Sequence, residues 1–183
     1  GDGTHEHPTQ AILDMTSLYE KFGYLKGLKI GIVGDISHSR VALSNIHGLK
    51  TMGAEVTLCG PATLIPPNAE ELGVNVNYNL DEVIEWSDAL NVLRIQRERM
   101  GGGLLPSVRE YRNLFGITPE RLANHKKELV IMHPGPMNRG VEIDSAVADS
   151  DQAIILDQVL NGVASRMAIL YLLLGGKYEE GKN

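Results

Sequence analysis

The sequence contains little cysteine, few aromatic residues and no excess of basic charge. Among its 183 residues Cys59 is the one cysteine, which excludes a disulfide framework and a thiolate metal cluster. A lone thiol favours a reducing compartment, so we expect the cytoplasm. The formal net charge of -6 argues against a nucleic-acid-binding surface, because a protein that neutralises phosphates needs a basic field.

Long apolar runs are absent as well. The longest, around Met167 to Leu174, is far shorter than the roughly 20 residues that span a bilayer, and no signal-peptide pattern is present. With 43% hydrophobic residues, the chain can bury the core of one domain, or of one domain and a fragment of another. The sequence opens Gly1-Asp2-Gly3 without a methionine and a helical pattern follows at once. We therefore expect a sequence that begins inside a longer protein.

Short apolar runs rich in β-branched residues alternate with helical patterns. The runs predict buried parallel strands at 28–35, 54–61, 74–78, 88–94 and 128–136. The segments between them predict helices at 39–51, 80–86, 107–114 and 119–126, the last with Thr118 as N-cap. This alternation predicts an α/β fold, with a doubly wound, mainly parallel sheet of about five strands and flanking helices. Such sheets bind ligands at the carboxyl ends of their strands.

Two further helices are predicted beside the sheet. The first spans about Pro8 to Phe22, with His7 at its N-cap. The last spans about Asp151 to Leu174, with Ser150 as N-cap and Gly175 as its stop. This last helix is apolar on several sides, and a single sheet face cannot cover all of them. We therefore expect a packing partner that lies outside this sequence.

Arginine is concentrated after the fourth predicted strand. Five of the nine arginines fall within nineteen residues, at Arg94, Arg97, Arg99, Arg109 and Arg112. Arg94 and Gln96 alternate with the strand period, so both can point the same way. Guanidinium groups pair bidentately with carboxylates and phosphates, which favours a small, multiply anionic substrate. The alternative is a set of surface salt bridges with Glu85, Glu98 and Glu110.

The glycine-rich segment 100–107 follows these arginines directly. Its composition suits either a lid that closes over a substrate and excludes water, or a flexible surface loop. The sequence leaves both interpretations open.

The segment after the first predicted strand excludes a dinucleotide site. Gly31 and Gly34 do not have the spacing of the G-x-G-x-x-G fingerprint, and no acidic residue ends the second strand. Ser37 to Arg40 nevertheless lie at a predicted helix N-terminus, where backbone N–H groups favour an anion. A capped helix start is the alternative.

The stretch H-E-H-P-T-Q, at residues 5–10, allows three interpretations. A metal pair of His5 and His7 is not expected, because Pro8 begins a helix rather than a strand and no further ligands stand out. His7 and Gln10 could form a helix cap only. Their side chains could also donate to a carbonyl oxygen and accept from an amide, as a substrate site would.

Four motifs together resemble the aspartate carbamoyltransferases. They are H-P-T-Q (7–10), G-D-I-S-H-S-R (34–40), R-I-Q-R-E-R (94–99) and H-P-G-P-M-N-R-G-V-E (133–142). Their order and spacing fit over essentially the whole chain. The related ornithine enzymes carry a Ser-Met-Gly loop and an H-C-L-P motif in place of the last two, and neither occurs here. The resemblance therefore favours aspartate.

The resemblance implies transfer of the carbamoyl group from carbamoyl phosphate to the amino group of L-aspartate. This step of pyrimidine biosynthesis gives N-carbamoyl-L-aspartate and phosphate, and it needs no cofactor and no metal. The implied catalytic residues are His7, which would bind the carbamoyl oxygen, and Gln10, which would hold the carbamoyl NH2. The implied substrate-binding residues are Arg40 and Arg94 for the two aspartate carboxylates, with Gln96 and the backbone around Gly135 and Pro136.

The resemblance also implies a division of the chain and a set of partners. Residues 1–22 would be an interdomain linker helix, 23–149 the aspartate-binding domain, and 150–183 a helix that packs on a carbamoyl phosphate domain. That N-terminal domain and its S-T-R-T-R motif are not found here, so a separate or cleaved chain is expected to supply it. A trimeric assembly is implied, with a dihydroorotase or a regulatory chain as further partners. Two alternatives stay open: a non-catalytic dicarboxylate-binding module, and a carbamoyltransferase that acts on another amine.

Overall fold

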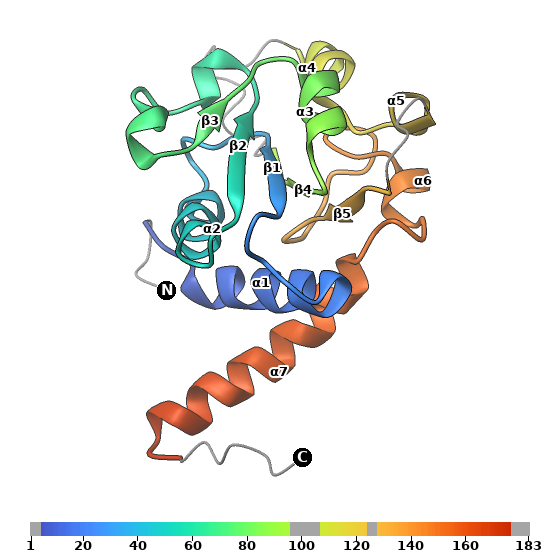
Figure 1. Cartoon of the computed structure of the whole chain (residues 1–183). Helices are drawn as coiled ribbons and strands as arrows, with labels where there is room; N and C mark the ends of the chain where they lie inside the picture. The colour runs from blue at the N-terminus through green and yellow to red at the C-terminus, as the bar shows by residue number, and fades with distance from the viewer. Residues whose placement is uncertain (1–4, 96–106, 124–127, 177–183) are drawn as a thin grey trace.

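A single parallel sheet forms the centre of the molecule. The computed structural model describes residues 5–95, 107–123 and 128–176 (Figure 1). In these ranges five strands pair in the order β3-β2-β1-β4-β5, and every pair is parallel. The strands are β1 (Lys29–Val33), β2 (Glu55–Cys59), β3 (Asn75–Val76), β4 (Ala89–Val92) and β5 (Val130–Met132). All five predicted strands are confirmed, and each is shorter than its apolar run.

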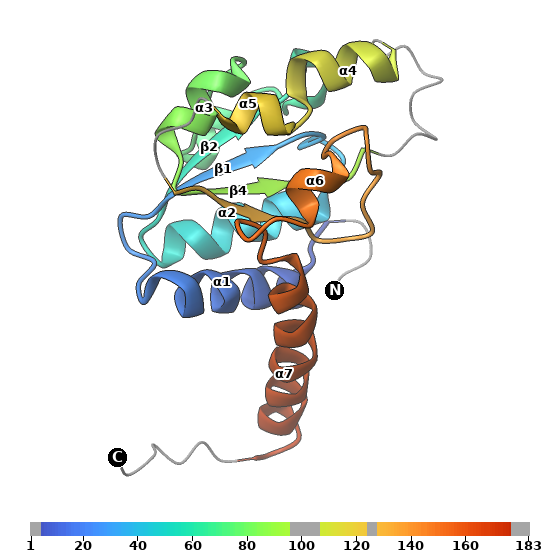
Figure 2. The ribbon, with the colours of Figure 1, turned by 90° about the vertical axis from the view of Figure 1, so that its right-hand side faces the viewer.

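Helices cover both faces of this sheet. They are α1 (Pro8–Phe22), α2 (Arg40–Thr51), α3 (Leu80–Trp86), α4 (Val108–Phe115), α5 (Pro119–Ala123), α6 (Ser145–Ala148) and α7 (Ile155–Leu173), with short 3-10 helices at Ala62–Leu64 and Ala69–Leu72. Figure 2 shows α1 and α2 on one face and α3, α4 and α5 on the other. The doubly wound fold is therefore confirmed.

Alternation along the strands divides the core into two clusters. Ile30 and Ile32 of β1 pack in the cluster under α1 and α2, whereas Val33 packs with Leu90 and Val92 in the cluster under α3 and α4. All five side chains are fully buried. Burial on both faces is the physical reason why these strands appear in the sequence as continuous apolar runs.

Several helix boundaries follow the predicted capping signals. The Ser39 hydroxyl accepts a hydrogen bond from the Ala42 N–H (3.2 Å), and that of Thr118 accepts from the Arg121 N–H (3.4 Å). Gly175 follows the end of α7 with a φ of +90°, a left-handed conformation that suits glycine. His7 occupies the N-cap position of α1 but makes no side-chain capping bond.

The predicted start of the last helix is wrong. α7 begins at Ile155 instead of Asp151, and the Ser150 hydroxyl donates to the carbonyl of Val147 rather than capping α7. The intervening segment pairs with β5, because the Ile131 N–H donates to the Gln152 carbonyl (2.8 Å) and the Ile154 N–H to the Ile131 carbonyl (2.9 Å). The helical periodicity of a sequence carries no information about backbone pairing with a distant strand. The short helix α6 was not predicted either.

The topology brings three chain segments to one edge of the sheet. The strand order reverses between β1 and β4, which is where such sheets open a crevice for ligands. We call the region formed by residues 34–40, 93–95 and 133–136, which follow β1, β4 and β5, the carboxyl edge. In Figure 2 the strands point to the right, and the N-terminal ends of α1 and α2 lie on that same side.

α7 leaves the body of the protein after its first turns. It runs past α1, and its second half extends away from the sheet (Figures 1 and 2). Within the described ranges, even this 19-residue helix does not meet the length and apolarity that a membrane span requires.

Candidate active site at the carboxyl edge

His7 is held at the start of α1 by contacts with α2. Its backbone N–H donates to the Ser44 hydroxyl (2.8 Å), and that hydroxyl in turn donates to the Glu6 carboxylate. Ser44 lies one turn after Arg40 on α2, and the charge of Arg40 acts on the imidazole of His7. Two residues from separate motifs, His7 and Arg40, therefore come together here.

The surroundings of His7 favour its neutral form. Partial burial lowers the pKa of the imidazole below its usual 6.5, and the positive charges of Arg40 and Arg166 lower it further. The Thr9 hydroxyl lies 3.4 Å from Nδ1. A neutral imidazole near pH 7 can donate a hydrogen bond to a carbonyl oxygen without delivering a proton to it.

Gln10 belongs to a buried polar cluster rather than to a helix cap. Its amide NH2 donates to Oδ1 of Asp14 (2.9 Å), a carboxylate that is fully buried. Three more amides donate to the same carboxylate: Gln158 at 2.8 Å, Asn45 at 2.8 Å and Asn91 at 3.3 Å. Burial raises the pKa of Asp14 above its ordinary value, and these four donors oppose that shift. The capping role considered for Gln10 is therefore wrong.

The same cluster reaches the turn after β5. The amide oxygen of Gln158 accepts from the backbone N–H of His133 (3.0 Å). His133 begins the segment that contains Gly135 and Pro136, both of which are exposed and joined by a cis peptide bond. Hydrogen bonds thus connect the start of α1 with the 133–136 turn, two parts of the predicted site that lie far apart in the sequence.

A second buried pair, His133 and Glu142, supports the 133–136 turn. Nδ1 of His133 accepts from the Gly135 N–H (2.9 Å), so its proton is on Nε2, which lies 3.3 Å from Glu142. Both side chains are completely buried. Glu142 also accepts from the Asn138 amide (3.2 Å), which donates to the Ile95 carbonyl as well (2.7 Å). The end of β4 and the turn after β5 are therefore linked.

The arginines differ in what they do. Arg94 lies two residues after β4, exposed at the carboxyl edge. Arg112 instead makes two hydrogen bonds with Asp144 (2.6 and 3.2 Å), so for this residue the salt-bridge interpretation is confirmed with a partner that was not predicted. Gln96 and residues 100–106 of the predicted lid lie outside the described residues.

One interpretation of the H-E-H-P-T-Q stretch is a metal pair of His5 and His7. In the described part of the chain no group of three histidine, cysteine, aspartate or glutamate side chains is arranged to hold a metal ion. His5 itself is exposed, at the beginning of the described residues.

Sequence motifs missed three residues of this site. Arg166 acts on His7 through its charge, and Asp14 and Gln158 connect Gln10 with the 133–136 turn. Asp14 stands four positions after Gln10 on α1, the spacing at which helical side chains meet, and this was the available signal. Arg166 and Gln158 belong to α7, and only the fold brings them to α1.

Comparisons with known proteins match nearly the whole chain. The family described as aspartate/ornithine carbamoyltransferase, Asp/Orn binding domain, matches residues 26–173. The aspartate carbamoyltransferase catalytic subunit of Gemmatimonas aurantiaca is 60% identical over 179 residues, which are 98% of this chain and 56% of that protein. The subunit of the same name from Moorella thermoacetica is 62% identical over 176 residues, which are 96% of this chain and 57% of that protein.

A solved structure gives the same result. Aspartate transcarbamoylase from Trypanosoma cruzi, in complex with carbamoyl aspartate and phosphate, superposes with a TM-score of 0.80 at 29% identity. The match covers 93% of this chain and 56% of that one. The present chain thus spans little more than half the length of the relatives that it matches.

Proposed function

This chain belongs to the aspartate/ornithine carbamoyltransferase family, and on that premise we propose that it is the amino-acid-binding part of an aspartate carbamoyltransferase. The reaction would transfer the carbamoyl group of carbamoyl phosphate to the amino group of L-aspartate. The amine nitrogen forms a bond to the carbonyl carbon, the bond from that carbon to the phosphate oxygen breaks, and phosphate leaves with the electron pair and takes up the proton that the amine loses. The observation that supports the proposal is that the charge of Arg40, at the carboxyl edge, acts on His7, which lies three residues before Gln10 at the start of α1.

In this proposal His7 and Gln10 bind the carbamoyl group. A neutral His7 donates to the carbonyl oxygen, where negative charge develops as the amine attacks. The Gln10 amide oxygen accepts from the carbamoyl NH2, and the backbone around Gly135 and Pro136 provides further acceptors. Catalysis then rests on orientation and electrostatic stabilisation by groups that the fold holds in place.

The aspartate carboxylates would bind to arginines from two neighbouring strand ends. Arg40 follows β1 and Arg94 follows β4, and these strands are paired side by side. Guanidinium groups at two such positions can bind the two carboxylates of one small dicarboxylate. Gln96 would help to place the same substrate. The names of the relatives at 60 and 62% identity favour aspartate over ornithine as that substrate.

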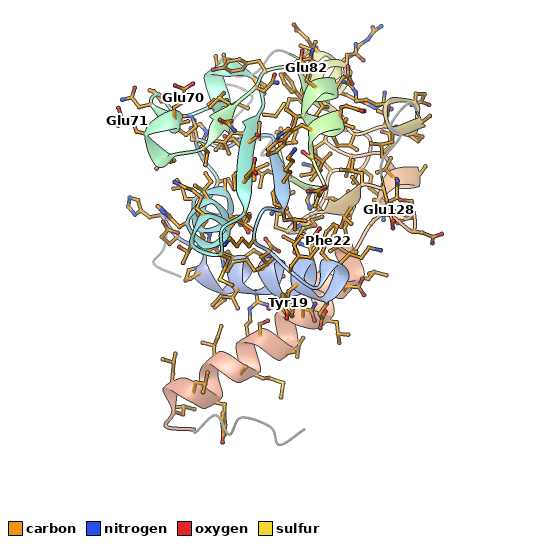
Figure 3. All side chains as sticks on the ribbon, viewed as in Figure 1. Tyr19, Phe22, Glu70, Glu71, Glu82 and Glu128 are labelled. Carbon is orange, nitrogen blue, oxygen red and sulfur yellow. The ribbon has the colours of Figure 1, made fainter. Side chains whose placement is uncertain are left out.

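The proposal needs a second part of the protein for carbamoyl phosphate. Leucines of α7 and of its C-cap are exposed to solvent, with Leu156 83%, Leu173 79% and Leu174 85% exposed. Figure 3 shows the side chains of its second half extending away from the rest of the molecule. We propose that residues 150–183 pack on a carbamoyl phosphate domain, that 1–22 link to it, and that 23–149 bind aspartate. A trimeric assembly in the cytoplasm belongs to the same proposal.

A complementation assay tests this function. The chain would be co-produced with the segment of the Moorella thermoacetica relative that lies outside the matched region, and carbamoyl aspartate would be measured. Replacing Arg94 by alanine should abolish turnover at ordinary aspartate concentrations. Arg112→Ala is the matched control, because Arg112 is paired with Asp144 and should leave turnover unchanged.

The alternatives make different forecasts in the same assay. A non-catalytic dicarboxylate-binding module would give no carbamoyl aspartate with any complementing segment, although it would still bind aspartate. A carbamoyltransferase for another amine would form product faster with ornithine or a related amine than with aspartate. Either result would refute the proposal.

A further inference from the structure

Beyond the residues of the motifs, Asp14 is the most heavily bonded buried acid of the site. It is 0% exposed and accepts hydrogen bonds from four side-chain amides. A buried carboxylate with this many partners is costly to desolvate, so its four bonds must compensate for much of that cost. Its contact with Gln10 connects it to the proposed carbamoyl site.

Two of the four amides cannot reverse their orientation. Gln158 accepts from the His133 backbone N–H through its oxygen, so its NH2 must face Asp14. Asn45 donates to the Val41 backbone carbonyl through the same NH2 that faces Asp14 (3.1 Å). Amide orientations are otherwise ambiguous, and here backbone partners resolve the ambiguity.

These fixed donors lie on both oxygens of Asp14, and Gln10 adds a further donor. Gln158 donates to Oδ1 and Asn45 to Oδ2, so each oxygen of Asp14 accepts a hydrogen bond from a donor of fixed orientation. The amide NH2 of Gln10 donates to Oδ1 as well (2.9 Å). Because the amide is planar, its oxygen then points to the opposite side, where it can accept from a bound NH2 group.

We propose that Asp14 is a positioning residue that fixes the amide of Gln10 with its oxygen toward the carbamoyl NH2 of the substrate. The inference rests on the proposed function for the identity of that ligand, and on the geometry alone for the orientation. An amide turned the other way would present two N–H donors to the donors of the carbamoyl group, and the hydrogen bonds would be lost.

The orientation is tested first, without any assay of activity. In the 183-residue chain with 15N-labelled glutamine, the Gln10 side-chain NH2 signals are identified as the pair that disappears in Gln10→Ala. Asp14→Asn should shift these signals and speed their exchange with water. Asn161→Ala, which removes a buried polar contact between α7 and α1 that does not involve Asp14, should leave them almost unchanged. A Gln10 amide that exchanges rapidly in the parent chain, or that Asp14→Asn does not alter, would overturn the inference.

The catalytic consequence is tested in the complemented assay. Gln10→Ala and Asp14→Asn should each lower kcat roughly tenfold to hundredfold, whereas Asn161→Ala should not. If Asp14 acts through Gln10, the double variant should lose no more than Gln10→Ala alone. If the losses of kcat in the two single variants multiplied in the double variant, Asp14 would have a merely structural role, and the inference would be refuted. An inactive parent would instead count against the proposed function, and the orientation would still be decided by the glutamine signals.

Discussion

At the scale of single residues, partial burial lowers the pKa of His7, and two neighbouring positive charges lower it further. Arg40 and Arg166 come from α2 and α7, and both lower the pKa of the imidazole, in addition to partial burial. Protonation is therefore less favourable in the folded state than in the unfolded chain. The folded state gains this stability above pH 6.5, and loses it as the pH falls through the lowered pKa.

Removing one of these charges should raise the pKa of His7. We expect Arg166→Ala to shift the titration of His7, followed by NMR, upward from its lowered value toward 6.5. Arg121→Ala is the control, because Arg121 is paired with Asp81 and does not contribute to the shift of His7. A His7 that already titrates at 6.5 in the parent chain would contradict this account.

Residues within the motifs could be predicted from the sequence, but the residues that support them could not. His7 and Arg40 stand in quoted motifs, and the fold brings them into electrostatic contact. Asp14 belongs to no motif, and its place in the sequence indicates only that it is part of α1. Its importance depends on Asn45, Asn91 and Gln158, which come from three other elements. Such a convergence is a property of the packed structure and has no local pattern.

At the scale of elements, the strands were the easiest part of the fold to predict. Runs such as 28–35 are apolar because both faces of the sheet are covered. The pattern can therefore be recognised within the run itself. The beginning of α7 was harder. Residues 151–154 have a helical pattern, but their backbone pairs with Ile131 of β5. Here a long-range backbone bond prevailed over local propensity.

The ends of β1 and β2 approach each other so closely that only glycine fits. A Cβ on Gly60 would lie 2.4 Å from the Gly34 carbonyl oxygen, a backbone atom that cannot move without shifting the carboxyl edge. We therefore expect Gly60→Ala to lower the free energy of unfolding by about 1–3 kcal/mol in urea denaturation.

A second glycine provides the comparison. In Gly48→Ala the new methyl group would approach the flexible end of Met15 closely and Ala11 at an ordinary contact distance, and alanine favours the helix by about 1 kcal/mol. This variant should be close to the parent in stability. If the two variants lost equal free energy of unfolding, the close approach of Gly60 to Gly34 would not explain the loss.

The contact between α7 and α1 is unusual because it is polar. Asn161 donates to Ser17 and Glu20 of α1, Gln158 donates to Asp14, and Gly162 packs against Leu13. The apolar residues of α7 lie mostly on its other sides. The buried side of α7 is thus polar and its exposed sides are apolar, the reverse of an ordinary amphipathic helix. We therefore expect an apolar substitution on the buried side to destabilise the fold more than a polar substitution on an exposed side.

Substitutions in α7 can test this inversion. Gln158→Leu adds apolar surface, yet it leaves the buried His133 N–H without an acceptor, so it should cost about 1–3 kcal/mol in the free energy of unfolding. Leu156→Gln, at an exposed position of the same helix, should change that free energy by less than about 0.5 kcal/mol. A larger loss for Leu156→Gln than for Gln158→Leu would contradict the described packing.

At the scale of the whole molecule, Cys59 reports on the integrity of the fold. Burial raises the pKa of its thiol to about 12, and its side chain is 0% exposed at the end of β2. We expect no reaction with a thiol reagent at pH 8 in the native protein, and complete reaction in denaturant. The modification rate should therefore follow unfolding as urea is increased. Rapid modification without denaturant would show that the sheet opens near β2.

The exposed apolar side of α7 determines how the chain should behave alone. Its uncovered residues include Leu156, Leu160, Val163, Met167, Leu170 and Leu173. A patch of this kind is rare on soluble monomers, because association removes it from water. We expect the isolated chain to bind an apolar dye and to self-associate in analytical ultracentrifugation. Replacing Leu160 and Leu170 by glutamine should weaken both effects, whereas the same change at the exposed Met52 and Tyr78 should not.

Co-production with a complementing segment tests this prediction most directly. If the uncovered side of α7 packs on another part of the enzyme, co-production with the Moorella thermoacetica segment should remove dye binding as activity appears. The Leu160 and Leu170 double variant should then need more of that segment to reach the same activity, since each buried leucine contributes about 1.5–3 kcal/mol to such a contact. A parent chain that is monomeric and binds no dye would show that α7 requires no partner, and the proposed division of the protein would lose its physical basis.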